Sequence, residues 1–236
     1  MIDWTLIAES WPLYLNGLKI SLILMAISVS ASFLLSVPLA IARVSPNPWL
    51  SKPVFLYTYV IRGTPLLVQL YMIYFGLAQF EWLRESIAWP LFRNAWFCAW
   101  LAFALNSTAY TTEILAGALR QTPSGELEAA RSLGMSTATI YGRILLPSAI
   151  RRALPQYGNE LVMVMHATSI ASAVTIVELT RTARDVYYNH LAPFEAFGLV
   201  ALFYFVITFA LVGLVKLLEG RFLRHLRPMS IPSKAA

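Results

Sequence analysis

The sequence predicts an all-α membrane protein with five transmembrane helices, and its composition carries much of this prediction. Of its 236 residues, 58% are hydrophobic and 13% are charged, whereas soluble domains carry about a quarter charged residues. The chain contains five long apolar segments, each near the length of about 20 residues that an α-helix needs to cross a bilayer. We see no internal repeat and no second domain, so residues 1–236 are predicted to form a single transmembrane domain.

The segments differ in how strongly they predict a span. Before the first, Asp3 and Glu9 are the only charges, so the positive region of a cleavable signal peptide is missing and this helix should stay in the membrane. The fourth is the least apolar, because Asn159, Glu160 and His166 interrupt it. A helix this polar must bury one face against protein or line a water-filled path. The predicted spans are residues 18–41, 55–79, 94–118, 155–178 and 196–218.

The distribution of lysine and arginine predicts the orientation, because cytoplasmic loops are enriched in both. Four of these residues fall on one side, with Lys19 near it: Arg84, Arg93, Arg181 and Arg184. Thirteen of the 18 fall on the other: Arg43, Lys52, Arg62, Arg120, Arg131, Arg143, Arg151, Arg152, Lys216, Arg221, Arg224, Arg227 and Lys234. The N-terminus is therefore expected outside, with the 119–154 loop and the C-terminus in the cytoplasm. The net charge of +6 fits attraction to anionic membrane lipid and requires no nucleic acid.

The 119–154 loop is long for a helix connection, and long loops with their own helical pattern are usually functional. Pro123 should end the preceding helix, and a short helix can follow it up to Gly134, which suits a left-handed C-terminal stop. Ser136 or Thr137 can cap a second short helix that ends near Pro147. Spacing alone leaves two interpretations open: an amphipathic hairpin that only anchors the loop, or a docking element for a cytoplasmic partner.

One pattern in this loop resembles a known motif. Glu128-Ala129-Ala130 is followed after three residues by Gly134 and, after nine more, by Ile144-Leu145-Leu146-Pro147. This spacing resembles the EAA loop of permease subunits in bacterial ATP-binding-cassette (ABC) importers. In that family the loop inserts into a groove on the ATPase, so that closure of the ATPase dimer moves the membrane helices. The resemblance implies that the ATPase-coupling residues are Glu128, Ala129, Ala130, Gly134, Ile144 and Pro147.

The resemblance extends over nearly the whole chain. Arg62-Gly63-Thr64-Pro65 resembles the RGTP signature of polar amino acid permeases, although Arg62 could also have only an anchoring role. Residues 109–114, 154–160 and 178–181 continue the similarity. Among these permeases the chain is most similar to the M-type subunits of the histidine and lysine/arginine/ornithine importers. The implied fold is the five-helix, MetI-like fold of type I ABC importer permeases, with cytoplasmic coupling helices.

The resemblance also implies a function. It implies a permease subunit in the inner membrane of a bacterium that imports basic or polar amino acids, namely histidine, arginine, lysine and ornithine. Its expected partners are a second homologous permease, two ATP-binding cassette ATPase subunits and a periplasmic amino-acid-binding protein. The N-terminus would be periplasmic and the C-terminus cytoplasmic. ATP and Mg²⁺ would bind to the ATPase subunits, and this chain would bind no cofactor.

The residues alone argue against an enzyme. The chain shows no Ser-His-Asp arrangement, no metal-spaced His/Cys/Asp cluster and no glycine loop of the kind that binds phosphate. The single cysteine, Cys98, excludes a disulfide within the chain and a cysteine-based metal cluster. We therefore predict a non-catalytic subunit with no metal site.

Polar residues in the predicted spans are candidates for a substrate path, since each is costly in lipid: Glu113, Asn159, Glu160, His166, Thr168 and Ser169. A cationic amino acid needs a carboxylate for its side chain and donors for its own carboxylate. Glu113 and Glu160 have the right charge, but both could instead snorkel or contact Arg120 or Arg152. His166 could line the path or make an interhelical hydrogen bond.

The fourth span departs from the family pattern. Many relatives carry Lys-Asp-Thr-Ser where this chain has His166-Ala167-Thr168-Ser169, so the acidic residue is missing. If that aspartate contacts substrate in relatives, the equivalent contact here must come from the partner permease.

Other functions remain as alternatives. A related permease could carry another polar amino acid or an opine. A secondary transporter would show two related halves with broken helices in corresponding positions, and we find none in the five predicted spans. A scaffold or channel subunit is a third possibility, but we identify no charged or carbonyl filter of the kind that selects ions.

Overall fold

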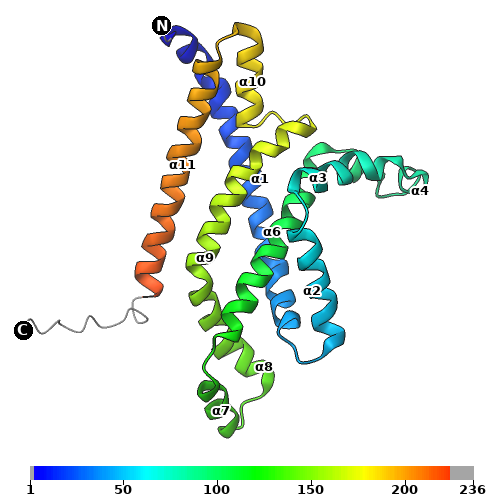
Figure 1. Ribbon diagram of the computed structural model, residues 1–236, viewed down its shortest axis with the longest axis vertical. Coiled ribbons are helices and arrows are strands. Elements are labelled where there is room, and N and C mark those ends of the chain that lie inside the picture. Colours follow the sequence, from blue (N-terminus) through cyan, green and yellow to red (C-terminus); the bar gives the residue numbers. More distant parts are fainter. Residues whose placement is uncertain (1–2, 224–236) are drawn as a thin grey trace, which may run out of the picture.

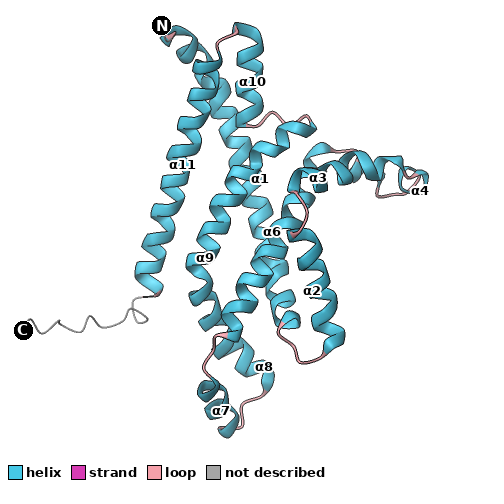
Figure 2. Cartoon of the chain, in the orientation of Figure 1, coloured by secondary structure: helices cyan, strands magenta, loops and turns pink. Residues whose placement is uncertain are grey.

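The computed structural model describes residues 3–223, and this range is helical throughout, with short loops and no strand (Figures 1 and 2). Its α-helices are α1 (Trp4–Arg43), α2 (Pro48–Arg62), α3 (Leu66–Tyr71), α4 (Glu81–Arg84), α5 (Trp89–Phe92), α6 (Ala95–Arg120), α7 (Ser124–Ser132), α8 (Thr137–Ile140), α9 (Leu146–Ala167), α10 (Leu179–His190) and α11 (Pro193–Phe222). The π turns are η1 (Met72–Gly76) and η3 (Tyr141–Leu145), and the 3-10 turns are η2 (Leu77–Gln79) and η4 (Thr168–Val174).

Helix α1 extends along most of the molecule and contributes buried residues to four apolar cores, two of which lie near its ends (Figure 1). Near its N-terminal end, Tyr14 is buried against α10 and α11, and its hydroxyl donates to the Ala196 carbonyl oxygen at 3.0 Å. Near its C-terminal end, Ala40 belongs to a core that also contains residues from α6, α7, α8 and α9. The first core contacts the loop between α10 and α11, and the second contacts the 119–154 loop.

The first span is longer than predicted. Asp3 caps α1, since its carboxylate accepts hydrogen bonds from the backbone N–H groups of Thr5 and Leu6 at 3.0 and 3.2 Å. Residues 4–17 are too polar to be recognised as a span by hydropathy alone. Gly17 keeps this part of α1 close to α10, because a Cβ there would lie 2.6 Å from the Thr182 Oγ1 atom.

The second predicted span, residues 55–79, is not one continuous helix. The chain breaks between α2 and α3, and the two segments are bent by 101° relative to each other. Pro65 has no N–H to donate, and its ring disfavours a helical conformation for the residue before it, so the helix ends before this point. The hydropathy of residues 55–79 shows that this segment is apolar, but hydropathy does not show whether the helix axis bends within it.

The fourth span also differs from the prediction. The second loop helix does not end near Pro147; it runs from α8 through η3 into α9. In η3 the Leu146 N–H bonds to the Tyr141 carbonyl oxygen, five residues earlier, and this widened turn lets the helix continue past a proline that cannot donate. After α9 and η4 the chain bends by 51° into α10, with Thr175 in the left-handed region at φ 66°.

By length and apolar composition, α1 and α11 could each cross a membrane, and the two bent pairs would raise the number among the described helices to four. Helix α6 has 26 residues, about 39 Å at 1.5 Å per residue, but the polar residues of its middle make it less apolar than α1. The predicted third span nearly coincides with the first part of α6, and the predicted fifth span lies within α11.

The charges predicted to face the cytoplasm gather at one end of the molecule, with one exception. The end of α1, the start of α2, and α7 and α8 lie together, opposite the N-terminus and α10 (Figure 1). Arg62, however, lies at the far end of α2, beside α6, rather than near the turn between α1 and α2, so it should not have been counted in this group. Arg224, Arg227 and Lys234 lie outside the described residues.

Candidate translocation cleft and coupling loop

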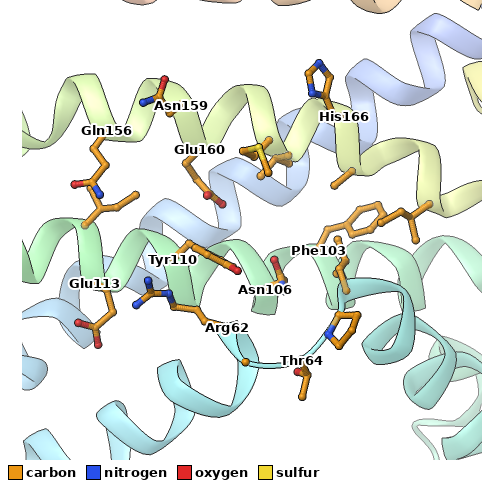
Figure 3. Close-up of a pocket in the computed structure, with 18 residues that line it drawn as sticks. Arg62, Thr64, Phe103, Asn106, Tyr110, Glu113, Gln156, Asn159, Glu160 and His166 are labelled. Atoms are coloured by element: carbon orange, nitrogen blue, oxygen red, sulfur yellow. The ribbon is translucent and has the colours of Figure 1, made fainter.

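A cleft of about 970 Å³ lies between the break after α2, the middle of α6 and the C-terminal half of α9 (Figure 3). The four signature residues, Arg62, Gly63, Thr64 and Pro65, form part of its wall. So do Glu113 and Glu160, two of the predicted path residues. The structure thus brings together segments that are almost one hundred residues apart in the sequence.

Gln69 on α3 holds the break between α2 and α3 in place. Its side-chain Nε2 donates to the carbonyl oxygens of Ile61 and Thr64 at 2.7 and 3.1 Å and to the Thr64 Oγ1 atom at 2.7 Å. Its Oε1 accepts from Asn106 Nδ2 on α6 at 3.0 Å. Backbone groups freed by the break are thereby satisfied, and the break is attached to α6.

The turn also requires a glycine. A Cβ on Gly63 would lie 2.9 Å from the Tyr59 carbonyl oxygen, closer than real Cβ atoms approach a backbone atom. A larger residue would shift the backbone at this point and move the neighbouring Arg62. The backbone of the RGTP segment therefore fixes the position of the Arg62 Cα atom in the cleft wall.

Arg62 contacts one side chain in the cleft wall. Its guanidinium carbon lies 5.1 Å from the centre of the Tyr110 ring, a distance typical of a cation–π interaction. Among the described residues, Arg62 makes no ion pair, and none of its N–H groups donates a hydrogen bond to protein. Its N–H groups therefore remain available to a ligand in the cleft.

Glu160 on α9 faces the same cleft from the other wall. Its exposed fraction is 8%, and none of the described cations lies within ion-pair distance of it. Figure 3 shows the Glu160 side chain directed from α9 toward α6, with Arg62 on the opposite wall and Tyr110 between them in this view. A buried carboxylate without an ion-pair partner is costly, so this arrangement favours a ligand that supplies a cation.

Glu113 has a partner that the sequence did not suggest. Its Oε1 atom accepts from Arg43 Nε on α1 and from Thr58 Oγ1 on α2, both at 2.7 Å. The expected contacts to Arg120 or Arg152 are not found: Arg152 donates to the Ala118 carbonyl oxygen at 3.0 Å and thereby binds the end of α6. Glu113 therefore ties α1, α2 and α6 together at one edge of the cleft.

Asn159 and His166 border the cleft, but Figure 3 shows their side chains on the far side of α9. His166 Nε2 lies 2.8 Å from Thr208 Oγ1 on α11, which is the interhelical hydrogen bond considered from the sequence. Thr168 and Ser169 do not line the cleft; their hydroxyls donate to the carbonyl oxygens of Met165 and His166 at 2.7 and 2.8 Å. Thr168 and Ser169 thus offer the cleft no functional group, whereas Asn159 and His166 lie at its border.

Other lining residues were not selected from the sequence. Asn106 and Tyr110 precede Glu113 on α6, and Gln156 precedes Glu160 on α9. In each case the residues are three or four positions apart, so they lie on one face of a helix. This periodicity around each glutamate was the signal that could have identified them.

The loop formed by α7 and α8 lies at one end of the molecule (Figure 1). Gly134 separates the two helices with φ 72°, a conformation that glycine adopts at little cost. Ser136 caps α8, since its Oγ accepts from the Thr139 N–H at 3.3 Å. Both features agree with the sequence prediction of two helices at a glycine elbow.

The coupling residues divide between the surface and the core. Glu128 and Ala129 are exposed, and the nearby Leu133 is 81% exposed. Ala130 is buried in the core shared with α1, α6 and α9, with Ile144 and neighbouring residues packed around it. The outer face of α7 is therefore free, while its inner face is attached to the long helices.

Within residues 3–223 no group of three or more His, Cys, Asp or Glu side chains could hold a metal ion. The chemistry of the cleft is thus that of two opposite charges and several neutral polar groups.

Comparison with known proteins agrees with this arrangement. Residues 32–224 match the family described as "Binding-protein-dependent transport system inner membrane component". The chain is 44% identical over 227 residues to the nopaline transport system permease protein NocM of Agrobacterium fabrum, covering 96% of this chain and 94% of the relative. It is 43% identical over 216 residues to the histidine/lysine/arginine/ornithine transport system permease protein HisM of Escherichia coli K12, covering 91% of both.

A solved structure supports the same assignment. The chain resembles a protein in the crystal structure of an amino acid ABC transporter with histidines, with a TM-score of 0.82 and 33% identity over 94% of this chain and 99% of the other. The predicted fold of ABC importer permeases is confirmed by this match.

Proposed function

Because the chain belongs to the family of binding-protein-dependent transport system inner membrane components, the permease subunits of ABC importers, we propose that it conducts a zwitterionic amino acid through the cleft between α2, α6 and α9. It is a non-catalytic amino acid permease component of the inner membrane, and ATP is hydrolysed by a partner ATPase. We also propose which residues line the path, which class of substrate passes along it, and how the chain is coupled to the ATPase.

The observation that carries the proposal is a pair of opposite charges on facing walls of the cleft, neither of which makes an ion pair among the described residues. Arg62 presents free N–H donors on one wall, and Glu160 presents a carboxylate on the other. The α-carboxylate of an amino acid matches the guanidinium, which binds carboxylates in a bidentate manner. The α-ammonium group matches Glu160. A neutral solute would leave both charges unpaired, which favours a zwitterion.

The substrate is proposed to be a basic or polar amino acid. Histidine, lysine, arginine and ornithine appear in the name of HisM, and the opine nopaline in that of NocM. Each of these molecules carries at least one carboxylate and one basic nitrogen. Since His166 is hydrogen-bonded to α11 and Ala167 has no polar group, Glu160 is the charge that the fourth span presents to the cleft.

Coupling to the ATPase is proposed to run through α7 and α8. Glu128, Ala129 and Leu133 form an exposed patch of one charge, one small residue and one large apolar residue, which suits insertion into a groove. Gly134 orients α7, and the buried Ala130 connects it with α1, α6 and α9. A push on α7 would therefore reach the helices that line the cleft.

We further propose that the chain pairs with a second homologous permease, binds two ATPase subunits, and receives substrate from a periplasmic binding protein. The N-terminus would be periplasmic, and the α7–α8 end would be cytoplasmic. Arg120, Arg131, Arg143 and Arg151 at that end support this orientation. ATP and Mg²⁺ would be bound entirely by the ATPase subunits.

Uptake by the reconstituted complex tests the path. We expect Arg62→Ala and Glu160→Gln each to lower kcat/KM for amino acid uptake by roughly 10- to 100-fold, the effect of losing one hydrogen bond to a charged group. Asn159→Ala is the matched control, because its side chain is next to Glu160 in the sequence but lies on the other side of α9. It should change uptake by less than about twofold.

Two results would overturn the proposal. One is normal uptake in both charge variants while the complex assembles as in the wild type. The other is uptake that persists without the ATPase and follows an ion gradient, which would indicate a secondary transporter.

A further inference from the structure

A second cavity of about 350 Å³ adjoins the cleft on the side where α1 ends. The two cavities share four lining residues: Arg62, Gly63, Tyr110 and Glu113. The remaining wall of this side cavity comes from the C-terminal end of α1 and from α2. The Arg62–Tyr110 stack therefore lies between two adjoining spaces, and Glu113 lines both.

Only half of the Glu113 carboxylate is used by the protein. Both donors, Arg43 Nε and Thr58 Oγ1, bind the same atom, Oε1. In the part of the chain that the structure describes, no donor reaches Oε2, and this atom is not among the polar atoms sealed away from solvent. A carboxylate that is fixed through one oxygen and open at the other can bind a cation without first being reoriented.

The group that fixes Glu113 is itself held in place. The Arg43 guanidinium carbon lies 4.8 Å from the centre of the Phe55 ring on α2, and its side chain is 18% exposed. Arg43 therefore positions the carboxylate but also reduces its negative potential. Arg62 on the neighbouring wall adds a second positive charge, so a simple cation entering the side cavity would be repelled.

An amino acid with a cationic side chain escapes this repulsion. Its own α-carboxylate, bound to Arg62, neutralises that guanidinium, and its side-chain cation is then free to reach Glu113. A neutral amino acid has the first group but not the second, and a decarboxylated amine has the second but not the first. The arrangement thus fits a molecule that carries both.

We propose that Glu113 is a second substrate-binding residue, whose free Oε2 receives the side-chain cation of a basic amino acid as it passes from the cleft into the side cavity. The inference rests on the proposed function, because it requires Arg62 to bind the α-carboxylate. In this proposal, the side cavity is the part of the path that the substrate enters after it passes the Arg62–Tyr110 stack.

The test compares two ways of breaking the same ion pair. ATP-driven uptake of radiolabelled L-arginine is measured with the full complex in proteoliposomes for Glu113→Gln and Arg43→Gln. Glutamine keeps an oxygen that accepts from Arg43 and Thr58 but removes the charge, so KM should rise about tenfold. Arg43→Gln leaves the carboxylate less neutralised, so KM should be unchanged or lower.

Two analogues of arginine, each lacking one of its charged groups, test the two binding contacts separately. L-Citrulline is the neutral isostere of arginine, and its inhibition of arginine uptake should not weaken in Glu113→Gln. Agmatine lacks the α-carboxylate and should inhibit the wild type poorly, because Arg62 then remains unneutralised. Copurification of the complex shows that each variant is assembled.

The outcomes separate the two proposals. Equal increases of KM in Glu113→Gln and Arg43→Gln would show a purely structural ion pair and overturn the inference, as would an unchanged KM in Glu113→Gln. If Glu160→Gln still lowers uptake in that case, the proposed path stands and only the role of Glu113 fails. If Arg62→Ala and Glu160→Gln are both without effect, the proposed function fails as well.

Discussion

Gln69 shows how one side chain can determine the shape of the cleft. Its amide nitrogen binds both sides of the break between α2 and α3, and its oxygen accepts from Asn106 on α6. An amide is suited to this position because it can donate and accept at the same time. No charged residue of similar size could do both. The position of Arg62 therefore depends on the neutral side chain of Gln69, which binds the neighbouring Ile61 carbonyl oxygen.

We expect Gln69→Leu to lower the free energy of unfolding of the purified protein by about 1–3 kcal/mol, because buried backbone carbonyls lose their donor. Arginine uptake should also fall, since Arg62 is no longer held at the wall. Thermal unfolding in detergent and uptake measure the two effects. Gln121→Leu, at an exposed position after α6, is the control; an equal effect there would argue against this role.

The residue scale is also where sequence reasoning reached its limit. Charge and polarity identified Glu160, and the family resemblance identified the signature residues; all of them line the cleft. The same criteria selected Thr168 and Ser169, whose hydroxyls instead bond to carbonyls one turn earlier in the chain. Sequence alone does not distinguish a hydroxyl that faces a path from one satisfied by its own backbone.

At the scale of elements, the two short helices of the coupling loop depend on the backbone of Gly134. Its φ of 72° lies in the left-handed region, where a residue with a Cβ is strained by roughly 1–2 kcal/mol. The space around Gly134 is open, so a substitution there acts through the backbone and not through a clash. The angle between α7 and α8 would change while the rest of the fold remained.

We therefore expect Gly134→Ala to uncouple transport. Uptake should fall at least about fivefold, in proportion to the strain, while the chain still inserts into the membrane and ATP hydrolysis by the complex no longer responds to substrate. Gly125→Ala is the matched control, because Gly125 lies in α7, has ordinary φ and equally open surroundings. Comparable losses in both variants, or normal uptake in Gly134→Ala, would count against a coupling role for this elbow.

Elements were predicted best where apolar periodicity was unbroken. The third and fifth predicted spans, 94–118 and 196–218, differ little from α6 and α11. A kink at Thr64-Pro65 was expected, but neither its size of 101° nor the π turn before α9 was predicted. Prolines marked both places, but a proline can end a helix, bend it or be accommodated by a wider turn, and the packing of neighbouring helices decides among these.

At the scale of the whole molecule, the orientation in the membrane can be measured because the chain has a single cysteine, Cys98, which is buried. In a Cys98→Ala background, we expect Glu9→Cys to react with a membrane-impermeant maleimide in spheroplasts. Leu133→Cys should react only in inverted vesicles. Both positions are exposed, so the sidedness of labelling reports topology. The reverse pattern would place the N-terminus in the cytoplasm.

The surface between α1 and α6 has a mechanical consequence. Part of the buried face of α1 consists of the small residues Ser28, Ser32 and Ser36, and the Ser32 Oγ atom lies 3.2 Å from the Ser107 Oγ atom of α6. Small residues let the two helix backbones approach closely here. On either side of this contact, Leu24 of α1 packs with Phe103 of α6, and Ala40 packs with Leu115. An axial shift of α6 along α1 would have to repack both places, so the two helices are expected to move together and to carry a displacement of the coupling loop toward the cleft.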